Sequence, residues 1–342
     1  MVHSGGIEQA MAETITVRQF WIRAPGHGEI VSADLPARQA DEVLVRTLYS
    51  GISRGTEALV FKGEVPPSQY QEMRAPFQEG EFPGPVKYGY ASVGKIEDGP
   101  DTTTKALRDR VVFCLYPHQD FYCVPIEGVT VVPDGVPASR AVLAANMETA
   151  VNAVWDGRPA AGDRIMVIGA GVVGLLISWL CRQMPGVQVS VVDINPARKM
   201  IAKNLGLPFF TEPPRNVNAD LVFHASGTPQ GLISALTVAG VEATIVDASW
   251  YGTRSVALPL GESFHSRRLT IRSSQVSRLH PERVPRWNRA RRMALALELL
   301  RDPHLDVLVM RESAFEDLPV LLAQLSRDSA DALCHRIRYA TP

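Results

Sequence analysis

The chain carries two different patterns of hydrophobic and polar residues, which change near Arg140. From about Thr14 to Pro133, short runs of β-branched and aromatic residues alternate with Gly, Pro and Asp, which is typical of closely spaced strands. These runs are TVRQFWI, EVLVRTLYS, ASVGKIE, RVVFCLY and FYCVPI. Such short strands favour a barrel-like or sandwich-like unit.

Beyond Arg140 the pattern predicts an alternation of helices and strands. The segment SRAVLAANMETAVNAVWDG has helical spacing of its apolar residues and ends at Gly157. Strands are predicted for DRIMVIG, VQVSVVD, ADLVFHAS, ATIVDAS and LTIRSSQV, and helices for VVGLLISWLCRQM, PARKMIAKNLG and PQGLISALTVAG. Alternating strands and helices predict an α/β fold with a doubly wound parallel sheet. A helix RWNRARRMALALELL, a strand VLVMRESAF, a helix LPVLLAQLSR and a strand ALCHRIRY complete the chain.

One segment, from Glu64 to Pro85, interrupts the first pattern. It is rich in Pro and Gly and also carries Tyr70, Met73, Phe77 and Phe82. A loop of this length and apolar content is either a lid or wall of a site, or a surface loop that packs its own side chains.

Charge and composition exclude several classes of function. The 342 residues contain 35 basic and 36 acidic side chains, so no net field attracts nucleic acid or an anionic membrane. A local excess of ten arginines over two acidic residues lies between His265 and Arg301, and it fits either a solvated face or an anionic partner. The longest apolar run, Gly171 to Cys181, is far shorter than the ~18 residues of a membrane span.

The start of the chain, MVHSGGIEQAMAETITVRQFWI, lacks the basic and apolar regions of a targeting signal, and Met11 is an alternative initiator. Cys114, Cys123, Cys181 and Cys334 have neither metal-site spacing nor a disulfide framework. We therefore expect a reduced, cytoplasmic protein that binds neither nucleic acid nor membrane.

A glycine-rich turn predicts a dinucleotide site. Gly169-Ala170-Gly171-Val172-Val173-Gly174 directly follows a predicted strand and opens a predicted helix. The first glycine allows the tight turn, the second lets the backbone approach a pyrophosphate, and the third permits close helix–strand packing. The helix N-terminus stabilises the anion.

Asp193 ends the next predicted strand, where a carboxylate can accept hydrogen bonds from an adenosine ribose. Its charge would repel a 2′-phosphate, so NAD(H) is favoured, although Arg198 one turn later keeps NADP(H) open. The alternative is a tight turn in which Asp193 only caps the following helix.

Further cofactor contacts are expected at the carboxyl ends of the other strands, where ligands bind in open α/β sheets. Ser226 and Gly227 end one strand, Trp250 and Tyr251 follow the next, and Ser274 ends the last. His224 and His265 lie near these groups, and for each a structural role is the simpler interpretation.

The order of these parts resembles the medium-chain dehydrogenase/reductase superfamily, the family of the zinc-type alcohol dehydrogenases. SGISRGTE resembles its S-G-x-C-x-T-D segment with one extra residue, VKYGYASVGKI resembles G-H-E-x-x-G-x-V, NMETAVNAV resembles the segment entering the linker helix, and DLVFHASGT resembles the strand–Gly turn beneath the nicotinamide. The resemblance implies a GroES-like β-rich catalytic domain (1–145), a Rossmann domain (146–280) and a C-terminal return (281–342). The residues of SGISRGTE and VKYGYASVGKI are most similar to those of the zinc-less group around bacteriochlorophyllide hydroxyethyl dehydrogenase.

The residues that match the zinc ligands of the family have all changed. Ser53 stands at the first position, Tyr90 and Ala91 replace the His-Glu pair, and Ala145 stands at the third position. The cysteines of the family's structural zinc lobe are also absent. Because zinc sites need Cys, His or carboxylate ligands, we expect no zinc; a rescued site would use His118, Asp120 or Glu148.

Hydride transfer without zinc still needs a proton donor and a stabiliser of the oxyanion. Thr56 matches the family's relay hydroxyl, and Tyr90 is the first candidate for acid/base or oxyanion contact, the alternative being an aromatic filler. Ser53 completes this group. Arg54 could neutralise a pyrophosphate or a substrate carboxylate, Glu57 matches an acidic residue that more often supports structure, and Lys87 and Glu148 are weaker candidates for the same pocket.

The sequence thus predicts a zinc-independent oxidoreductase that moves a hydride between NAD(H) and a secondary alcohol or ketone. The resemblance to an enzyme that acts on a tetrapyrrole side chain, together with the aromatic loop, suggests a small-molecule substrate larger than ethanol. The alternatives are an NADPH-dependent quinone or enoyl reductase, a non-catalytic dinucleotide-binding sensor or scaffold, and a zinc alcohol dehydrogenase. The resemblance also implies a homodimer formed through the edge of the Rossmann sheet.

Overall fold

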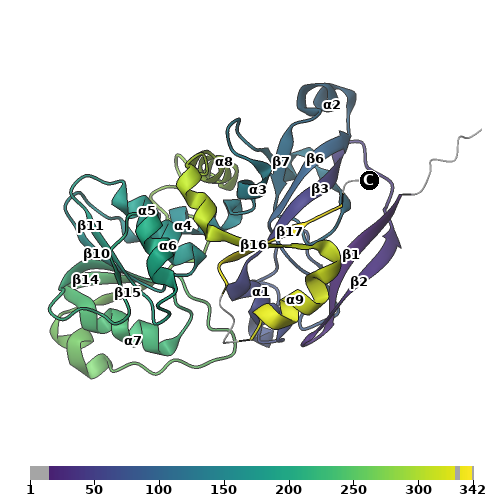
Figure 1. Cartoon of the computed structure of the whole chain (residues 1–342). Helices are drawn as coiled ribbons and strands as arrows, with labels where there is room; N and C mark the ends of the chain where they lie inside the picture. The colour runs from purple at the N-terminus through teal and green to yellow at the C-terminus, as the bar shows by residue number, and fades with distance from the viewer. Residues whose placement is uncertain (1–14, 328–331, 341–342) are drawn as a thin grey trace, which may run out of the picture.

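The computed structural model describes residues 15–327 and 332–340, and it divides into two units with helices between them (Figure 1). The expectations about a targeting signal and about Met11 as initiator concern residues 1–14, which lie outside the described residues.

One unit is built on a six-stranded sheet in which every pair of neighbouring strands is parallel. Its order is β12-β11-β10-β13-β14-β15. The strands are β10 (Arg164–Ile168), β11 (Gln188–Val192), β12 (Phe209–Phe210), β13 (Ala219–His224), β14 (Ala239–Asp247) and β15 (Thr270–Ser273). Because the order runs outward in both directions from β10 and β13, this is the doubly wound sheet predicted from the sequence.

Helices cover both faces of this sheet because successive side chains of a strand point to opposite sides. Ile165 and Val167 of β10 share one hydrophobic cluster with α4 (Ala144–Gly157) and α5 (Val172–Arg182). Met166 and Ile168 share another cluster with α7 (Pro229–Val238). The remaining helices of this region are α6 (Arg198–Asn204), the π-helix η3 (Leu260–Phe264), α8 (Arg289–Leu299) and the 3-10 helix η4 (Pro303–Leu308).

The other unit is β-rich. Its larger sheet runs β16-β17-β3-β6-β7-β9, with β8 also paired to β3, and its smaller sheet runs β2-β1-β5-β4. The strands are β1 (Thr16–Ala24), β2 (His27–Asp34), β3 (Glu42–Ile52), β4 (Glu79–Gly80), β5 (Val86–Lys87), β6 (Ser92–Asp98), β7 (Val111–Cys114), β8 (Phe121–Pro125), β9 (Val129–Val131), β16 (Val309–Ala314) and β17 (Cys334–Arg338). The C-terminal strands therefore return to the unit formed by the first part of the chain, and β17 pairs antiparallel with β3.

Two short helices, α1 (Arg54–Phe61) and α2 (Asp101–Leu107), were not predicted from the sequence pattern. The single helix predicted from Ser139 to Gly157 is divided into α3 (Ala138–Ala141) and α4. The 3-10 helices η1 (Pro67–Gln69), η2 (Ile126–Gly128) and η5 (Phe315–Asp317) and the helix α9 (Leu318–Leu325) complete the described elements. Leu59, Val60 and Phe61 of α1 are buried, so packing against the β-rich core stabilises this short helix.

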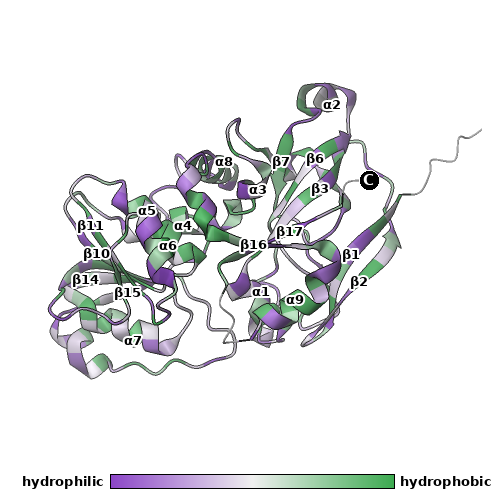
Figure 2. Cartoon of the chain, in the orientation of Figure 1, coloured by the Kyte–Doolittle hydropathy of each residue, from purple (hydrophilic) through white to green (hydrophobic). Residues whose placement is uncertain are grey.

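Figure 2 shows the expected distribution of hydropathy, with hydrophobic residues on the central strands and both kinds of residue on helices such as α9. Of the helices within residues 15–327 and 332–340, each is too short or too polar to cross a bilayer. All four cysteines are free thiols.

Candidate active site

The candidate site begins at the carboxyl edge of the parallel sheet. The strand register places the last residues of five neighbouring strands side by side, namely Val192, Ile168, His224, Asp247 and Ser273. The segments that follow these strands carry the predicted cofactor residues, so one edge of the sheet collects them.

The glycine turn has the shape that a dinucleotide requires. Gly169 has a φ of 110°, and a Cβ there would lie 2.7 Å from the backbone nitrogen of Ser226. A Cβ at Gly174 would overlap the carbonyl oxygen of Gly169, whereas one at Gly171 would meet nothing within 4 Å. Gly171 is the N-cap of α5, followed by the half-buried Val172 and Val173. The turn is therefore closed on the protein side and open at Gly171, which fits a pyrophosphate at the helix N-terminus.

Asp193 fixes this turn to the next strand. Its carboxylate accepts a hydrogen bond from the backbone nitrogen of Ala170 at 2.7 Å and one from that of Asn195 at 2.8 Å. The side chain is half-buried, and a carboxylate has further lone pairs for a ribose hydroxyl. The residues present thus fit the adenosine end of a dinucleotide.

Arg198 takes a different position from the one expected. Its side chain is buried, and the guanidinium donates to the carbonyl oxygen of Ala332 at 3.2 Å and contacts the sulfur of Met310 at 3.7 Å. Arg198 therefore ties α6 to the C-terminal return, and these contacts direct its charge away from a phosphate of the cofactor.

A second polar group lies on β13 and β14. His224, fully buried, bonds Asp247 through Nδ1 at 2.9 Å and Ser226 through Nε2 at 2.7 Å. The hydroxyl of Tyr251 donates to Asp247 at 2.9 Å, and Asp247 together with burial raises the pKa of Tyr251. Gly227, with a φ of 68°, donates its N–H to the Ser249 hydroxyl.

This network fixes the turn that holds Ser226 and Gly227 and the loop that holds Tyr251. Sequence reasoning did not single out Asp247. Its place at the carboxyl end of the strand ATIVDAS is the signal that could have found it.

The third group of polar side chains lies in the β-rich unit, at the start of α1 and after β5. Ser53 precedes α1, Thr56 lies in its first turn, and Tyr90 follows β5. Burial and the nearby Glu57 carboxylate raise the pKa of Tyr90 to about 12, and they outweigh the hydrogen bonds of the Ser53 and Thr56 hydroxyls to the Tyr90 oxygen, which lower that pKa. Asn146 of α4 lies 3.4 Å from the Ser53 hydroxyl.

The structure therefore brings together three of the five predicted catalytic residues, and Tyr90 stays protonated at neutral pH. Sequence reasoning missed Asn146, because only the fold brings α4 to these side chains.

The two units meet close to this group. Trp250, which follows β14, packs against the same hydrophobic cluster as Tyr90, and a Cβ at Gly252 would lie 2.6 Å from the carbonyl oxygen of Glu64. The segment after β14, with its predicted cofactor residues, thus lies against the β-rich unit near Tyr90.

The other two predicted catalytic residues, Arg54 and Glu148, have partners elsewhere. Arg54 donates to the carbonyl oxygens of Leu325 and Arg327, at the end of α9. Glu148 forms a buried ion pair with Arg292 of α8 at 3.0 Å, and burial raises the pKa of Glu148. We assign both residues structural roles, because their charges are engaged by helix–helix contacts rather than by the Tyr90 group.

Ser274 donates to Asp156 at 2.6 Å and so ties the end of β15 to α4. Lys87 is likewise engaged: it is buried, donates to Gln119 at 2.7 Å and pairs with Glu79.

No metal centre is found among the described residues, since no three His, Cys, Asp or Glu side chains of residues 15–327 and 332–340 are grouped to hold an ion. The residues considered for a rescued site are separated by their partners. His118 bonds Glu57, Asp120 bonds Arg18 and Glu148 bonds Arg292.

The aromatic loop from Glu64 to Pro85 packs its side chains inward. Tyr70 lies 5.7 Å from Phe82, Phe82 lies 5.7 Å from Tyr88, and Tyr88 lies 5.9 Å from Tyr90, as ring centroids. Phe82 is buried and Phe77 stacks on Tyr116. The loop is thus joined to the Tyr90 group by a continuous row of rings.

Several side chains of the arginine-rich segment have partners within the fold. Arg292 pairs with Glu148, Arg301 pairs with Glu298, and Arg291 lies over the ring of Trp287. Arg272 shares the imidazole of His280 with Arg158. These contacts favour the structural interpretation of the segment over an anionic partner.

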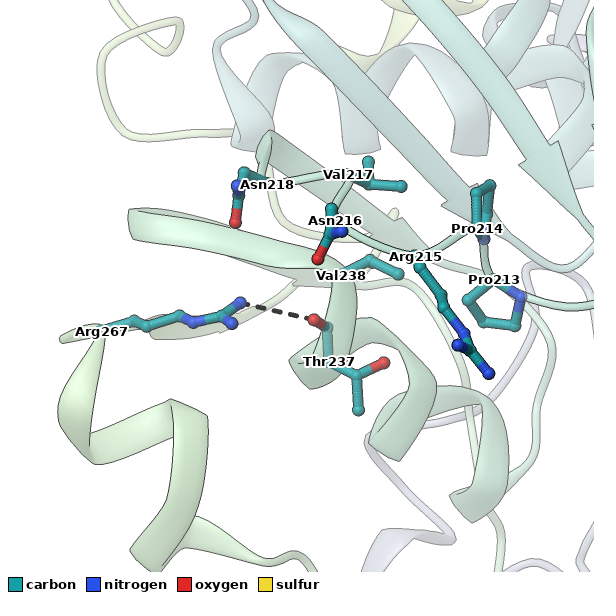
Figure 3. A pocket seen from close by; sticks show the side chains of 9 residues that line it. All are labelled: Pro213, Pro214, Arg215, Asn216, Val217, Asn218, Thr237, Val238 and Arg267. Carbon is teal, nitrogen blue, oxygen red and sulfur yellow. Dashed lines mark hydrogen bonds between the residues drawn. The ribbon is translucent and has the colours of Figure 1, made fainter.

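A hollow of about 320 Å³ lies at the opposite edge of the parallel sheet, and Figure 3 shows the side chains that line it. It is lined by the loop before β13 and by the end of α7, where Arg267 donates to the carbonyl oxygens of Thr237 and Ala239. This hollow lies at the amino end of β13, whereas the predicted cofactor residues lie beyond the carboxyl ends of the strands.

Comparison with known proteins supports the same architecture. No protein-family model matches the chain. Starvation-sensing protein RspB from Escherichia coli K12 is 24% identical over 298 residues, which cover 76% of this chain and 84% of that protein. D-guloside 3-dehydrogenase from Escherichia coli K12 is 25% identical over 312 residues, which cover 83% of this chain and 88% of that protein.

Solved structures agree over nearly the whole length. Short chain alcohol dehydrogenase (rspB) from Escherichia coli CFT073, complexed with NADH, superposes with a TM-score of 0.74 at 17% identity and covers 94% of this chain and 99% of that one. A putative zinc-binding dehydrogenase from Sinorhizobium meliloti 1021 bound to NADP gives a TM-score of 0.73 at 15% identity, with 95% and 99% covered. The fold class predicted from the sequence is confirmed: a Rossmann-like parallel sheet and a separate β-rich unit, as in zinc-binding dehydrogenase structures. The names of the sequence relatives support the zinc-type alcohol dehydrogenase-like superfamily.

Proposed function

We propose that the protein is a zinc-independent oxidoreductase that transfers a hydride between NAD(H) and a secondary alcohol or ketone. The observation that carries this proposal is the group of three hydroxyls, Ser53, Thr56 and Tyr90, at and beside positions that match the family's zinc ligands by sequence resemblance. The same relatives are the reason for expecting redox chemistry at this place.

The dinucleotide is assigned to the turn from Gly169 to Gly174. When the dinucleotide is bound, its nicotinamide would supply or receive the hydride. Asp193 supports NAD(H), because its carboxylate can accept from a ribose diol and would repel a 2′-phosphate. The contacts of Arg198 with Ala332 and Met310 support the same choice, since that guanidinium is engaged elsewhere.

Tyr90 is assigned the proton transfer. In the reductive direction its phenol donates a proton to the carbonyl oxygen as negative charge develops there. The Ser53 and Thr56 hydroxyls, bonded to the Tyr90 oxygen, orient the phenol and stabilise the phenolate. One hydride and one proton added to the carbonyl balance its reduction to the alcohol.

We propose that the reaction requires no metal, because the side chains at the three positions that match zinc ligands are not suited to hold one. A hydroxyl, a phenol and a methyl group stand at Ser53, Tyr90 and Ala145, and none of these is a customary zinc ligand. The polar side chains nearby are engaged with each other, as Glu57 and His118 are at 2.9 Å. These features support placing the chain with the zinc-less group that resembles bacteriochlorophyllide hydroxyethyl dehydrogenase.

A substrate larger than ethanol is proposed from that resemblance. Tyr70 and Tyr90, the partly exposed ends of the row of rings, would line an apolar wall, with Phe82 and Tyr88 buried behind them. We further propose a cytoplasmic location, since the four thiols are free and three of them are buried.

The proposed function is tested by following NADH absorbance at 340 nm with a panel of ketones. The panel contains small aliphatic, sugar-like and bulky aromatic ketones. Turnover with NADH is expected, and Tyr90→Phe should lower kcat by about 10²- to 10⁴-fold, the usual contribution of a general acid. Preference for NADPH with consumption of a conjugated alkene would instead identify a quinone or enoyl reductase. NADH binding without turnover of any compound would identify a sensor or scaffold.

We also propose a homodimer that forms through β15, the last strand of the parallel sheet. Its residues Thr270, Arg272 and Ser273 are exposed and its free edge offers unpaired backbone groups. Light scattering on the purified protein should give twice the 37.4 kDa of one chain, and Ile271→Pro should give a single-chain mass. A single-chain mass for the unaltered protein would exclude this assembly.

A further inference from the structure

A buried chain of hydrogen bonds runs beneath the Tyr90 group. Tyr339 lies 3.0 Å from the Ser50 hydroxyl, Ser50 lies 2.7 Å from Nδ1 of His118, and Nε2 of His118 lies 2.9 Å from the Glu57 carboxylate. The other oxygen of Glu57 accepts from the backbone nitrogen of Ser53 at 2.7 Å. The four side chains are between 1% and 4% exposed, so they have one another and no bulk water as partners.

The donors in this chain can be ordered. A carboxylate only accepts, so Nε2 of His118 carries the hydrogen that Glu57 receives. With the hydrogen on Nε2 alone, Nδ1 accepts from Ser50, and Ser50 accepts from Tyr339. Every polar atom of the chain is satisfied in this arrangement, which makes it a defined and rigid unit.

His118 also touches the backbone beside Tyr90. A Cβ at Gly89 would lie 2.9 Å from Cδ2 and 3.1 Å from Nε2 of the imidazole, and the φ of Gly89 is 133°. Only glycine allows the backbone to pass this close to the ring. The ring packs edge-on against Phe20 on another side, with centroids 6.4 Å apart, and so cannot move away.

His118 therefore contacts both parts that make up the hydroxyl group. Through Glu57 it holds the Ser53 end of α1, and through Gly89 it holds the segment that carries Tyr90. These parts are far apart in sequence, and His118 comes from a third segment, between β7 and β8. Motif matching does not indicate this role for His118, because the residue lies outside the segments that resemble the dehydrogenases.

We propose that His118 is a positioning residue that sets the distance between the Tyr90 phenol and the Ser53 and Thr56 hydroxyls. This inference rests on the proposed function for the chemistry that the three hydroxyls perform. The Glu57 charge that His118 holds in place is also a cause of the raised pKa of Tyr90. A displaced Glu57 would thus alter both the geometry and the acidity of the phenol.

The test compares His118→Leu with His118→Gln. Leucine removes the hydrogen bond to Glu57, whereas the amide of glutamine can still donate to it. His280→Leu is the matched control, because His280 is also buried but bonds Arg158 and Arg272 in the other part of the fold. Two measurements are made: turnover of the best ketone in the panel, and the fluorine NMR spectrum of protein labelled with fluorotyrosine. The Tyr90 resonance is identified by its loss in Tyr90→Phe.

In His118→Leu the Tyr90 resonance should move and kcat should fall by about ten- to hundredfold, as for a small misplacement of a reacting group. The NADH dissociation constant should stay within about twofold, because the dinucleotide turn is on the other unit. His118→Gln should restore both readouts, and His280→Leu should leave the Tyr90 resonance in place. An unmoved resonance in His118→Leu, or equal effects of Leu and Gln, would overturn the proposal.

Failure of this proposal is distinguishable from failure of the proposed function. If no ketone is turned over, the fluorine spectra still report whether His118 positions Tyr90. If His118→Leu does not fold, Glu57→Gln and Ser50→Ala are measured in its place, since each breaks one link of the chain while removing few atoms. An unmoved Tyr90 resonance in both of these variants would equally overturn the proposal.

Discussion

In the proposed function, the hydroxyls of Ser53, Thr56 and Tyr90 take the place of a metal ion. A metal ligand holds an ion by its lone pair, whereas a protonated phenol donates a hydrogen bond directly to the substrate oxygen. Burial and the Glu57 carboxylate raise the pKa of Tyr90 to about 12. The phenol therefore keeps its proton throughout the physiological pH range, as the proposed role requires.

Motif matching placed Ser53, Thr56 and Tyr90 in one group before their contacts were known. It could not identify Asn146 or the Glu57–His118 pair, because those contacts join segments that are far apart in sequence. It also assigned site roles to Arg54 and Glu148, and a charged residue type alone does not reveal that its partner lies on α9 or α8.

At the residue scale, Asp193→Ala tests the ribose assignment. Loss of the charge-assisted hydrogen bonds should weaken NADH binding by about 1–3 kcal/mol, measured by fluorescence titration. Asp163→Ala, which alters an aspartate of the loop before β10, is the control and should bind NADH normally. Unchanged affinity in Asp193→Ala would remove this residue from the cofactor site.

At the scale of elements, the turn between β10 and α5 and the helix α1 show two extremes of predictability. The glycine turn was predicted from its spacing, and the structure gives a physical reason at two positions: Gly169 has a φ of 110°, and a Cβ at Gly174 would overlap the Gly169 carbonyl oxygen. The eight-residue helix α1 was missed, because so short a segment depends on tertiary packing rather than on its own propensity. Its position matters most, since it carries Thr56 and Glu57.

Two alanine substitutions separate the roles of the glycines. In Gly174→Ala the methyl group would overlap the Gly169 carbonyl, so both thermal stability and NADH binding should fall. In Gly171→Ala the methyl group meets open space, and its φ of −72° suits any residue. That variant should keep the melting temperature but lose affinity for NADH, because the methyl group stands where the pyrophosphate approaches. Equal NADH affinity in Gly171→Ala and the unaltered protein would contradict the assignment.

At the scale of the whole molecule, the two units are joined by the return of the C-terminal strands to β3. The sequence pattern predicted these strands as elements, but their pairing partner lies almost 300 residues earlier, and only the family resemblance indicated it. Hydrophobic periodicity is local, so it identifies strands without identifying which sheet receives them.

Stability should decline at alkaline pH because the core buries protonated thiols and phenols. Burial raises the pKa of Cys114, Cys181 and Cys334 to about 12 from 9.0, and it raises those of Tyr88 and Tyr122 above 10.0. The folded state therefore holds protons that the unfolded chain loses, and stability falls as pH rises from 9 toward 12. Urea midpoints should be constant between pH 7 and 8.5 and then decrease; a constant midpoint to pH 11 would contradict the buried placement of these groups.

The central claim is hydride transfer without a metal, and one measurement tests it most directly. Turnover of the best ketone with NADH is measured before and after exhaustive treatment with a zinc chelator, with the residual metal quantified by elemental analysis. We predict the same kcat before and after treatment in protein that contains no stoichiometric zinc. Loss of turnover on chelation, with recovery on adding Zn²⁺, would contradict the assignment of the proton transfer to Tyr90.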